Sequence, residues 1–442
     1  MFKILCFFLI FTPTMLTQEN IIEKPSKQIT APNIKTIIQR PYVASMIGTI
    51  LECYDNALYG FMAPILTGIF LPEMNPVNAL ILAFAIYPLG LISRPLGGFL
   101  LGKMGDRLGR KRALILSLTG MAIATGLIGC MPTYATIGLA APILLALLNV
   151  SQKFFAGGEY NGGAIFMLEH SKKHKGFRSG LYCACAVSGI LIAALVAAII
   201  SYLPINYWRI AYLLGFLTAL FGLYLRKNIP ETPEFQAINP KPISKLKVSL
   251  RDSITHYKYS LLWSIGAAGF FSALYNIPAV FMNAFVPLVN NISTQQMLVI
   301  NTLVLFIYML VLPLFGALAD LLTPRKSMIL SAITTIIVSY PLFLLLNANS
   351  LIHIIIMKLC FVLLVAWFIA PFHAWIQNLY DVKNRYQLIS LTYSIGIQFG
   401  SATPVLALWA WKSTGLIQIP AVFIIAWALL GTLSLFHAKS KA

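Results

Sequence analysis

Long apolar segments alternate with short polar turns along most of this 442-residue chain. A helix of about twenty apolar residues crosses the hydrocarbon core of a bilayer. The segments of about this length or longer predict about twelve membrane-spanning helices, near residues 42–70, 78–102, 112–131, 138–168, 180–203, 208–226, 260–289, 297–318, 327–347, 351–377, 386–411 and 417–437. The predicted fold class is therefore an all-α membrane protein.

Two related basic turns interrupt the apolar pattern about half a chain apart. The first runs from Gly102 to Arg112 between the second and third predicted helices, and the second runs from Gly316 to Lys326 between the eighth and ninth. Repeated turns of this kind indicate a duplicated membrane bundle, which is typical of proteins that move a solute across the bilayer.

The longest polar stretch separates the two halves of the chain. Residues 227–259 contain Pro230, Pro233, Pro240 and Pro242 together with many lysines, and this composition predicts a cytoplasmic linker. The expected division is an N-terminal cytoplasmic or interfacial segment, an N-terminal half of six helices, the linker, a C-terminal half of six helices and a cytoplasmic tail, at residues 1–41, 42–226, 227–259, 260–437 and 438–442.

Composition excludes one large soluble core. Hydrophobic residues make up 59% of the chain and charged residues only 10%, whereas soluble domains carry about 25% charged residues. The net charge of +19 does not indicate nucleic-acid binding, because the cations lie mainly in one set of turns. The alternate turns at residues 71–78, 132–136, 290–296 and 347–350 contain none, and only Arg209 and Lys412 lie near the opposite side. By the positive-inside rule, the basic turns and both termini are expected on the cytoplasmic side of the cell inner membrane.

The sequence carries no pattern typical of a metal or catalytic site. The six cysteines are scattered without Cys-x-x-Cys spacing, and no nucleotide-binding loop or catalytic triad is present. We therefore expect no cofactor and no enzymatic activity.

Residues 1–16 resemble the charged start and apolar core of a signal peptide. A cleaved signal would place the basic turns outside the cell, and the cations just before the first predicted helix also favour the cytoplasm. We favour an interfacial segment or an over-extended start over a functional signal.

Three of the thirteen acidic residues lie within predicted membrane helices, namely Glu52, Asp55 and Glu159. A carboxylate in the bilayer costs at least about 2.5 kcal/mol unless it is paired, hydrated or protonated, so these residues are candidates for a proton or substrate path. A carboxylate without a charged partner suits a proton carrier, and we rank Glu159 and Asp55 above Glu52. The alternative is that the three pair with interior cations such as Arg94, Lys153 or Lys358.

The spacing of polar residues places several of them on shared helix faces. Glu52 and Asp55 are three residues apart, and Tyr59 continues their face. In the fourth predicted helix one face carries Gln152 and Glu159. Nearby glycines predict close packing of that helix against a neighbour, at Gly157, Gly158, Gly162 and Gly163.

Aromatic residues are abundant, and rings of this kind form the cages that bind quaternary ammonium groups. The candidates are Tyr54, Tyr59, Tyr160, Tyr182, Trp367 and Trp375. Packing and interfacial belts use the same residue types, so the sequence leaves both interpretations open.

The first basic turn, Gly102–Arg112, matches the signature G-x-x-x-D-x-x-G-R-[KR]-[KR] of the major facilitator superfamily, which the chain resembles over roughly residues 40–437. Further motifs are similar to those of its metabolite:proton symporter family, including Glu52-Cys53-Tyr54-Asp55, Arg94-Pro95-Leu96-Gly97-Gly98 and Gly157-Gly158-Glu159-Tyr160. The resemblance implies two pseudo-symmetric six-helix halves around a central cavity that opens to one side at a time.

The resemblance also implies a function and roles for particular residues. It implies a secondary transporter that imports a small zwitterion such as proline or betaine together with protons, with no nucleic acid and no obligatory protein partner. For proton coupling or substrate binding it points to Glu52, Asp55, Tyr59, Arg94, Gln152, Glu159 and Tyr160. For a cytoplasmic gate it points to Gly102, Gly105, Asp106, Arg107, Gly109, Arg110, Lys111, Asp320 and Arg325.

The chain departs from the family pattern at Asn149, where members usually carry a cation linked to coupling, and at Lys153, where they carry glycine. The second basic turn also has Thr323 and Pro324 in place of the glycine and first arginine of the signature. These departures leave open whether coupling is retained. Two alternatives to a zwitterion transporter therefore stay open. One is a carrier of dicarboxylates or other organic acids, with Arg94, Lys153 or Lys358 facing the substrate. The other is a transporter-derived sensor that binds solute without moving it.

Overall fold

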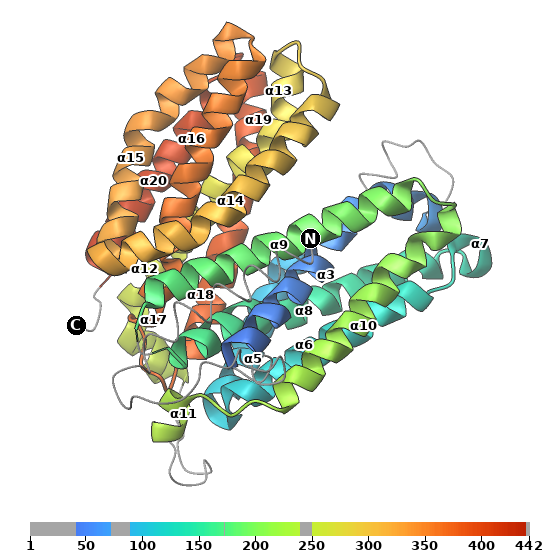
Figure 1. Ribbon diagram of the computed structural model, residues 1–442, viewed down its shortest axis with the longest axis vertical. Coiled ribbons are helices and arrows are strands. Elements are labelled where there is room, and N and C mark those ends of the chain that lie inside the picture. The colour runs from blue at the N-terminus through green and yellow to red at the C-terminus, as the bar shows by residue number, and fades with distance from the viewer. Residues whose placement is uncertain (1–40, 72–88, 172, 239–249, 439–442) are drawn as a thin grey trace, which may run out of the picture. The chain divides into compact units, whose positions relative to one another are not determined.

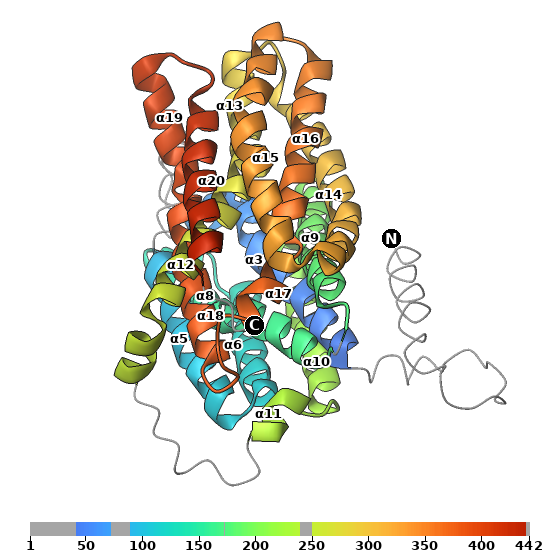
Figure 2. The ribbon, with the colours of Figure 1, turned by 90° about the vertical axis from the view of Figure 1, so that its left-hand side faces the viewer.

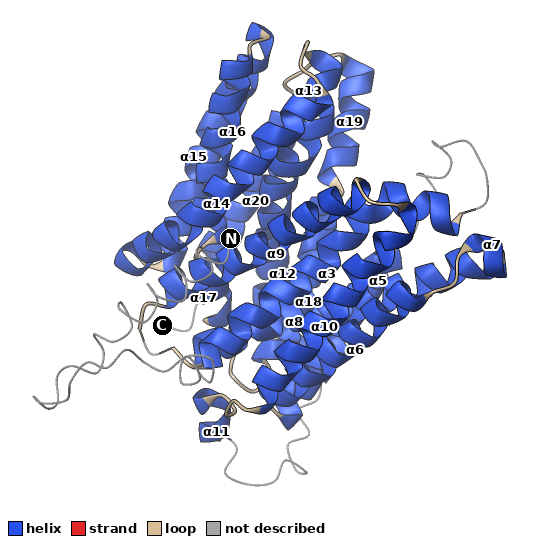
Figure 3. Cartoon of the chain, turned by 45° about the vertical axis from the view of Figure 1, so that its right-hand side comes forward, coloured by secondary structure: helices blue, strands red, loops and turns tan. Residues whose placement is uncertain are grey.

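The computed structural model describes residues 41–71, 89–171, 173–238 and 250–438. These residues all belong to one compact unit, residues 39–442, and they form helices and no strands (Figure 3). The all-α prediction is confirmed. Among the described helices, nine are long and apolar enough to cross a membrane by length and composition. The predicted segment at residues 1–16 lies outside the described residues, as does the part of the predicted helix near 78–102 that precedes Leu89.

The N-terminal half contains long helices joined by short turns. They are α3 (Pro41–Phe70), α5 (Leu89–Leu108), α6 (Arg110–Cys130), α8 (Ala140–Glu169), α9 (Lys175–Ser201) and α10 (Trp208–Lys227), with the short α7 (Tyr134–Ile137) before α8. Helix α8 packs against α3, α5 and α6, and α10 packs against α6 and α3. The C-terminal part of α8, from Ala156 to Glu169, is buried among these neighbours.

The C-terminal half repeats this arrangement with more irregular helices. They are α12 (Leu250–Asn276), the π-helix η4 (Ile277–Phe281), α13 (Met282–Val289), α14 (Thr294–Leu322), α15 (Pro324–Leu344), η5 (Leu345–Ala348), α16 (Leu351–Ile369), α17 (Phe372–Gln377), α18 (Arg385–Ser401), α19 (Thr403–Thr414) and α20 (Ile419–His437). Several irregular points coincide with proline, which removes a backbone donor and disturbs a helix. Pro278 lies in η4, Pro371 precedes α17 and Pro404 lies in the first turn of α19.

Two helices extend into residues 227–259, which the sequence assigns to the linker. Helix α12 begins at Leu250 rather than near residue 260, and α11 (Pro233–Ile238) lies at the end of the bundle where α10 ends (Figure 2). Apolar length measures only the part of a helix that lies in the bilayer, and backbone hydrogen bonds carry a helix beyond it. The linker is therefore shorter and more structured than its composition indicates.

The two halves meet along two pairs of helices. Helix α9 packs against α14, and α5 packs against α18 (Figure 1). Counted among the long helices, α9 and α18 are the fifth of their halves, and α5 and α14 are the second. In each pair, the fifth long helix of one half therefore contacts the second long helix of the other half. The contact between the halves is pseudo-symmetric.

Glycines allow the helices around α8 to approach closely. A Cβ atom at Gly157 would collide with the backbone oxygen of Arg94, and one at Gly97 would collide with the backbone oxygen of Phe154. Helices α5 and α8 therefore cross with their backbones in contact, as the glycine pattern of α8 predicts.

Candidate functional site

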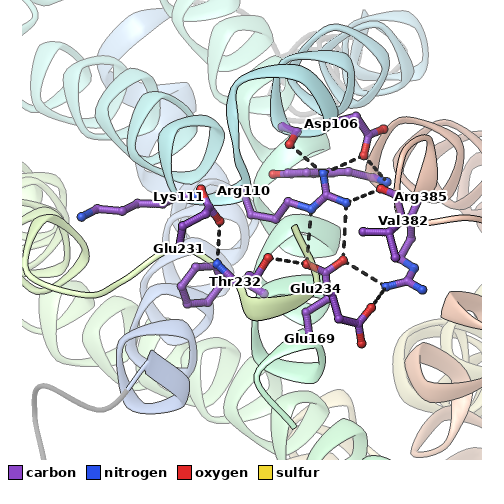
Figure 4. A network of polar contacts seen from close by, with 12 residues as sticks. Asp106, Arg110, Lys111, Glu169, Glu231, Thr232, Glu234, Val382 and Arg385 are labelled. Atoms are coloured by element: carbon purple, nitrogen blue, oxygen red, sulfur yellow. Dashed lines mark hydrogen bonds and ion pairs between the residues drawn. The ribbon is translucent and has the colours of Figure 1, made fainter. Parts of the chain in front are cut away.

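Asp106, at the end of α5, joins the two halves through the backbone of α18. Its carboxylate accepts hydrogen bonds from the backbone N–H groups of Tyr386, at 3.1 Å, and Gln387, at 2.8 Å. Arg110 donates to the same carboxylate at 2.8 Å (Figure 4). The first N–H groups of a helix have no partner within the helix and carry partial positive charge, so a carboxylate stabilises that end. Asp106 thus binds a helix end of the opposite half.

Asp320, in the second basic turn, makes the corresponding contact in the other direction. Its carboxylate accepts from the backbone N–H groups of Gly176, at 2.6 Å, and Phe177, at 2.8 Å, in the first turn of α9. Each half therefore contributes an aspartate that binds the N-terminal end of a helix in the other half. We call the end of the bundle where these turns meet the basic end.

Glu169, the last residue of α8, lies at the centre of a second set of contacts at the basic end (Figure 4). Arg385 donates to it at 3.0 Å from the C-terminal half, and Arg110 lies 3.4 Å away on the N-terminal side. Thr232 also donates to Glu169, at 2.7 Å. Arg385 forms a further ion pair with Glu234 of α11, at 2.5 Å. We use the term basic-end latch for the cross-half contacts of Asp106, Asp320, Glu169 and Arg385.

Arg110 extends the latch with a bond of its own, since it donates to the backbone oxygen of Val382 in the C-terminal half at 2.5 Å. His170 follows Glu169 and lies partly buried. Burial lowers the pKa of His170, so it stays neutral near pH 7 and adds no positive charge beside Glu169.

Other residues expected in the gate support the first basic turn from within its own half. Gly105 accepts a hydrogen bond from Arg110 through its backbone oxygen, at 2.7 Å. Gly109 has a φ of 108°, a conformation that favours glycine. The backbone N–H of Lys111 donates to Glu231 at 3.1 Å, and its ammonium donates to the backbone oxygen of Lys227 at 2.8 Å.

The remaining gate candidates occupy different positions. Gly102 lies against the backbone of Gln387, where a Cβ would come within 2.6 Å of its Cα, so this glycine permits the contact of α5 with α18. Arg107 is exposed. Arg325 donates to the backbone oxygens of Leu435 and Phe436, both at 2.7 Å, and so binds the end of α20 in its own half. The structure thus does not bring Arg325 together with the two aspartates.

Glu159 is paired inside the N-terminal half. Its carboxylate lies 2.5 Å from the guanidinium of Arg226 and accepts a hydrogen bond from Ser117 at 2.5 Å. Glu159 therefore has a charged partner, in agreement with the alternative that these carboxylates pair with interior cations. The partner of Glu159 is Arg226, which differs from the candidate cations Arg94, Lys153 and Lys358. Arg226 lies in the last turn of α10, next to a polar turn. Its long side chain nevertheless points into the N-terminal half and is only 2% exposed.

Asp55 and Glu52 are also buried, with exposures of 2% and 1%. Asp55 accepts a hydrogen bond from Thr125 at 3.2 Å, and Gln152 donates to the same hydroxyl at 2.7 Å. Glu52 accepts from the thiol of Cys53 at 3.2 Å. Within the part of the chain that the structure describes, neither carboxylate has a cation at ion-pair distance.

Two cations nevertheless lie in the neighbourhood of Glu52. Arg94 on α5 and Lys153 on α8 are close enough to interact with it electrostatically. Lys153 donates to the side-chain oxygen of Asn56 on α3. The interior of the N-terminal half thus brings together most of the polar residues expected there, whereas Tyr59 packs in an apolar cluster with Leu58 and Met62.

Aromatic rings from both halves meet at Tyr160. Its ring stacks on Tyr393 of α18 with centroids 5.4 Å apart, and His373 and Tyr182 lie at 5.3 Å and 5.6 Å. These rings form one buried group across the interface between the halves. Among the other proposed cage residues, Tyr54 and Tyr59 belong to an apolar cluster of the N-terminal half, and Trp367 donates to Ser327. Trp375 lies at the edge of the group, against Phe372, whose ring contacts Tyr393.

The chain matches the family model described as Major Facilitator Superfamily over residues 45–291. The chain belongs to the Major Facilitator Superfamily. It is 29% identical to the proline/betaine transporter of Salmonella typhimurium (strain LT2), over 95% of this chain and 88% of that protein. It is 28% identical to the glycine betaine/proline/ectoine/pipecolic acid transporter OusA of Dickeya dadantii (strain 3937), over 92% of this chain and 84% of that protein.

Solved structures of the Major Facilitator Superfamily share this fold. The proton:xylose symporter XylE, bound to 6-bromo-6-deoxy-D-glucose, superposes with a TM-score of 0.71 at 15% sequence identity. The similarity covers 91% of this chain and 95% of that chain. The present chain is thus a multi-pass membrane protein with the predicted bundle of two six-helix halves.

The sequence alone did not identify four residues of the site in the present chain, namely Glu169, Glu234, Arg385 and Arg226. Three of them, Glu169, Glu234 and Arg385, lie in segments that the sequence predicts as turns, where charge indicates only orientation in the membrane. The available signal was that these predicted turns are all expected on the same side of the membrane, so that opposite charges from different turns could meet there.

Proposed function

We propose that the protein is a secondary active transporter of the inner membrane that imports a small zwitterion, such as proline or betaine, together with protons. The two similar proteins described above carry betaine and proline in their names, and this supports the substrate class. The fold shared with a proton:xylose symporter is compatible with proton symport.

The basic-end latch is the observation that carries this proposal. In alternating access, two halves rock about a central site that faces one side at a time. A device that closes one end must bind one half to the other and must be reversible. Two aspartates on opposite helix ends, with the Glu169–Arg385 pair between them, meet both requirements.

The direction of closure follows from charge. The positive-inside rule places the basic end, and with it both termini, in the cytoplasm. The conformation described here then corresponds to a carrier closed on the cytoplasmic side. Release of solute into the cell requires the latch to break.

For the proton path we propose Asp55 and Glu52. Both lie inside the N-terminal half and have hydrogen-bond donors but no cation at ion-pair distance among the described residues. Protonation would remove the charge that opposes movement of the site through the membrane. Glu159 suits this role less, because Arg226 holds its charge in every step that keeps the pair together.

One observation favours a second candidate, a carrier of dicarboxylates or other organic acids. The cations inside the bundle include Arg94 and Lys153 near Glu52, and Lys358 in the C-terminal half. Interior cations of this kind suit an anionic substrate.

Uptake into proteoliposomes tests the proposal and separates the two candidates. Labelled proline, glycine betaine and succinate would be offered with and without an inside-alkaline pH gradient. We expect proline or betaine to accumulate above equilibrium with the gradient, and a protonophore to abolish accumulation while exchange continues. Uptake of succinate alone would favour the organic-acid carrier, and uptake that ignores the gradient would contradict proton symport.

A further inference from the structure

A lysine of the C-terminal half lies inside the bundle. Lys358 on α16 is 1% exposed, and its ammonium donates to the side-chain oxygens of Asn283, at 2.6 Å, and Asn301, at 2.9 Å. The two acceptors come from α13 and α14. A lysine ammonium has three donors, so one remains after these two bonds.

The charge of Lys358 is not balanced by a carboxylate among the described residues. No carboxylate there lies at ion-pair distance from it, and Asp320 and Asp381 are bound elsewhere, to the first turn of α9 and to Tyr257. An ammonium held only by neutral amide oxygens in a membrane bundle is costly. An anionic group of a ligand would provide the missing charge.

A small cavity lies beside this lysine. Lys358 lines it together with Tyr275 of α12 and Tyr308 of α14, whose ring centroids are 6.1 Å apart. A tyrosine face attracts an ammonium group, and the attraction increases when water is excluded. The lining of the cavity therefore includes a lysine and two aromatic rings, a combination that can complement a zwitterion.

The backbone beside the cavity is irregular. Pro278 and Ala279, which line it, belong to the π-helix η4 between α12 and α13. Single π-helical turns occur frequently at functional sites, and interrupted helices build the solute sites of many transporters. The irregular segment thus marks the same place as the lysine.

We propose that Lys358 binds the carboxylate of the transported solute and that Tyr275 and Tyr308 face its ammonium group. This assignment rests on the proposed function, since it names the substrate site of that carrier. All five side chains of the site, including Asn283 and Asn301, belong to the C-terminal half and would move as a unit. Enlargement of the cavity for a solute then requires movement of side chains and of η4.

A purely structural role predicts a different outcome. Lys358 also connects α13, α14 and α16, so its removal would weaken the fold whatever it binds. The test therefore measures preference between solutes rather than uptake alone. Choline and prolinamide lack the carboxylate of glycine betaine and proline and serve as matched competitors.

In proteoliposomes, the unmodified carrier should bind the carboxylate solutes about 10- to 100-fold better than choline and prolinamide, the range for one charge-assisted hydrogen bond. Lys358→Gln keeps a donor for the asparagines but removes the charge, so this preference should largely disappear. Lys358→Arg should retain it. Lys412→Gln, at an exposed lysine of α19, is the matched control and should match the unmodified protein.

Each outcome decides the assignment. If the unmodified carrier transports proline or betaine and Lys358→Gln keeps the preference, with uptake and melting temperature falling together, Lys358 is structural and the assignment is wrong. If Lys358→Gln does not reach the membrane, Lys358→Arg decides: a folded Arg variant that loses the preference contradicts the assignment. If the unmodified protein transports none of the carboxylate solutes, both the proposed function and this site are contradicted.

Discussion

At the scale of residues, the pair of Glu159 and Arg226 shows how burial changes the meaning of a charge. Both side chains are nearly inaccessible, at 1% and 2% exposure, and they lie 2.5 Å apart. Two buried charges stabilise each other but also lose their hydration, so the pair adds little net stability. Removal of one partner leaves the other buried and uncompensated, which is strongly destabilising.

Glu159→Gln should therefore lower stability by about 3–5 kcal/mol, the usual cost of breaking a buried pair. Thermal melting of the purified protein in detergent measures this directly. The double variant Glu159→Gln with Arg226→Met removes both charges and should regain much of the loss. A single variant that melts like the unmodified protein would show that Arg226 is not held by Glu159.

Asp55 and Glu52 should respond differently, because each lacks a cation at ion-pair distance among the described residues. Asp55→Asn or Glu52→Gln should keep the protein folded and keep solute exchange, yet abolish accumulation driven by a pH gradient. Thr125→Val removes the hydroxyl bonded to Asp55 and is the structural control. If both carboxylate variants still accumulate solute, the proton path lies elsewhere.

The residues of the interior could be predicted only in part. The free-energy cost of placing a carboxylate in the bilayer is enough to select Glu52, Asp55 and Glu159 as candidate functional residues. Sequence cannot show where a long side chain at a helix end points, and Arg226 turns inward rather than toward water. Nor could it show that Arg385 meets Glu169, because that contact joins residues 216 positions apart.

At the scale of elements, the crossing of α5 and α8 depends on glycine in both helices. The Cβ of alanine at Gly157 would collide with the backbone oxygen of Arg94, which cannot move away as a flexible side chain could. Helix α8 also carries Glu159, Tyr160 and Gln152, so its separation from α5 sets the geometry of the interior.

Gly157→Ala should therefore destabilise the protein by about 1–3 kcal/mol, as overpacking usually does. Gly68→Ala is the matched control, because a Cβ at Gly68 on α3 meets no atom within 4 Å. The melting temperature in detergent should fall for the first variant and not for the second. Equal melting temperatures would mean that α5 and α8 can separate without cost.

Helix number and order were predictable because a bilayer fixes how long an apolar segment must be. The ends of the helices were less predictable. Polar residues continue α12 back to Leu250, and the segment predicted near 386–411 divides into α18 and α19 at Ala402, just before Thr403 and Pro404. Hydropathy averages over such a break, so only the proline indicates it.

At the scale of the whole molecule, the two halves hold each other at the basic end by the same contact used twice. Asp106 binds the first turn of α18, and Asp320 binds the first turn of α9. The two related basic turns in the sequence indicate that these two aspartates occupy corresponding positions. Only the structure shows that each aspartate binds the opposite half. Because the contacts lie on both sides of the pseudo-symmetry axis, opening of this end must break both.

Asp106→Asn and Asp320→Asn should each shift the carrier toward the state that is open at the basic end. Each variant weakens bonds to a helix end, and bonds to a charged group contribute about 1.5–3 kcal/mol. Spin labels at Leu108 and Leu321, exposed residues of opposite halves, would report the separation in a background without native cysteines. We expect a population at longer distance in each single variant and a larger one in the double variant. Arg325→Gln is the control, because Arg325 binds the end of α20 within its own half and should leave the distance unchanged. An unchanged distance in the double variant would mean that Glu169 and Arg385 hold this end closed without the aspartates.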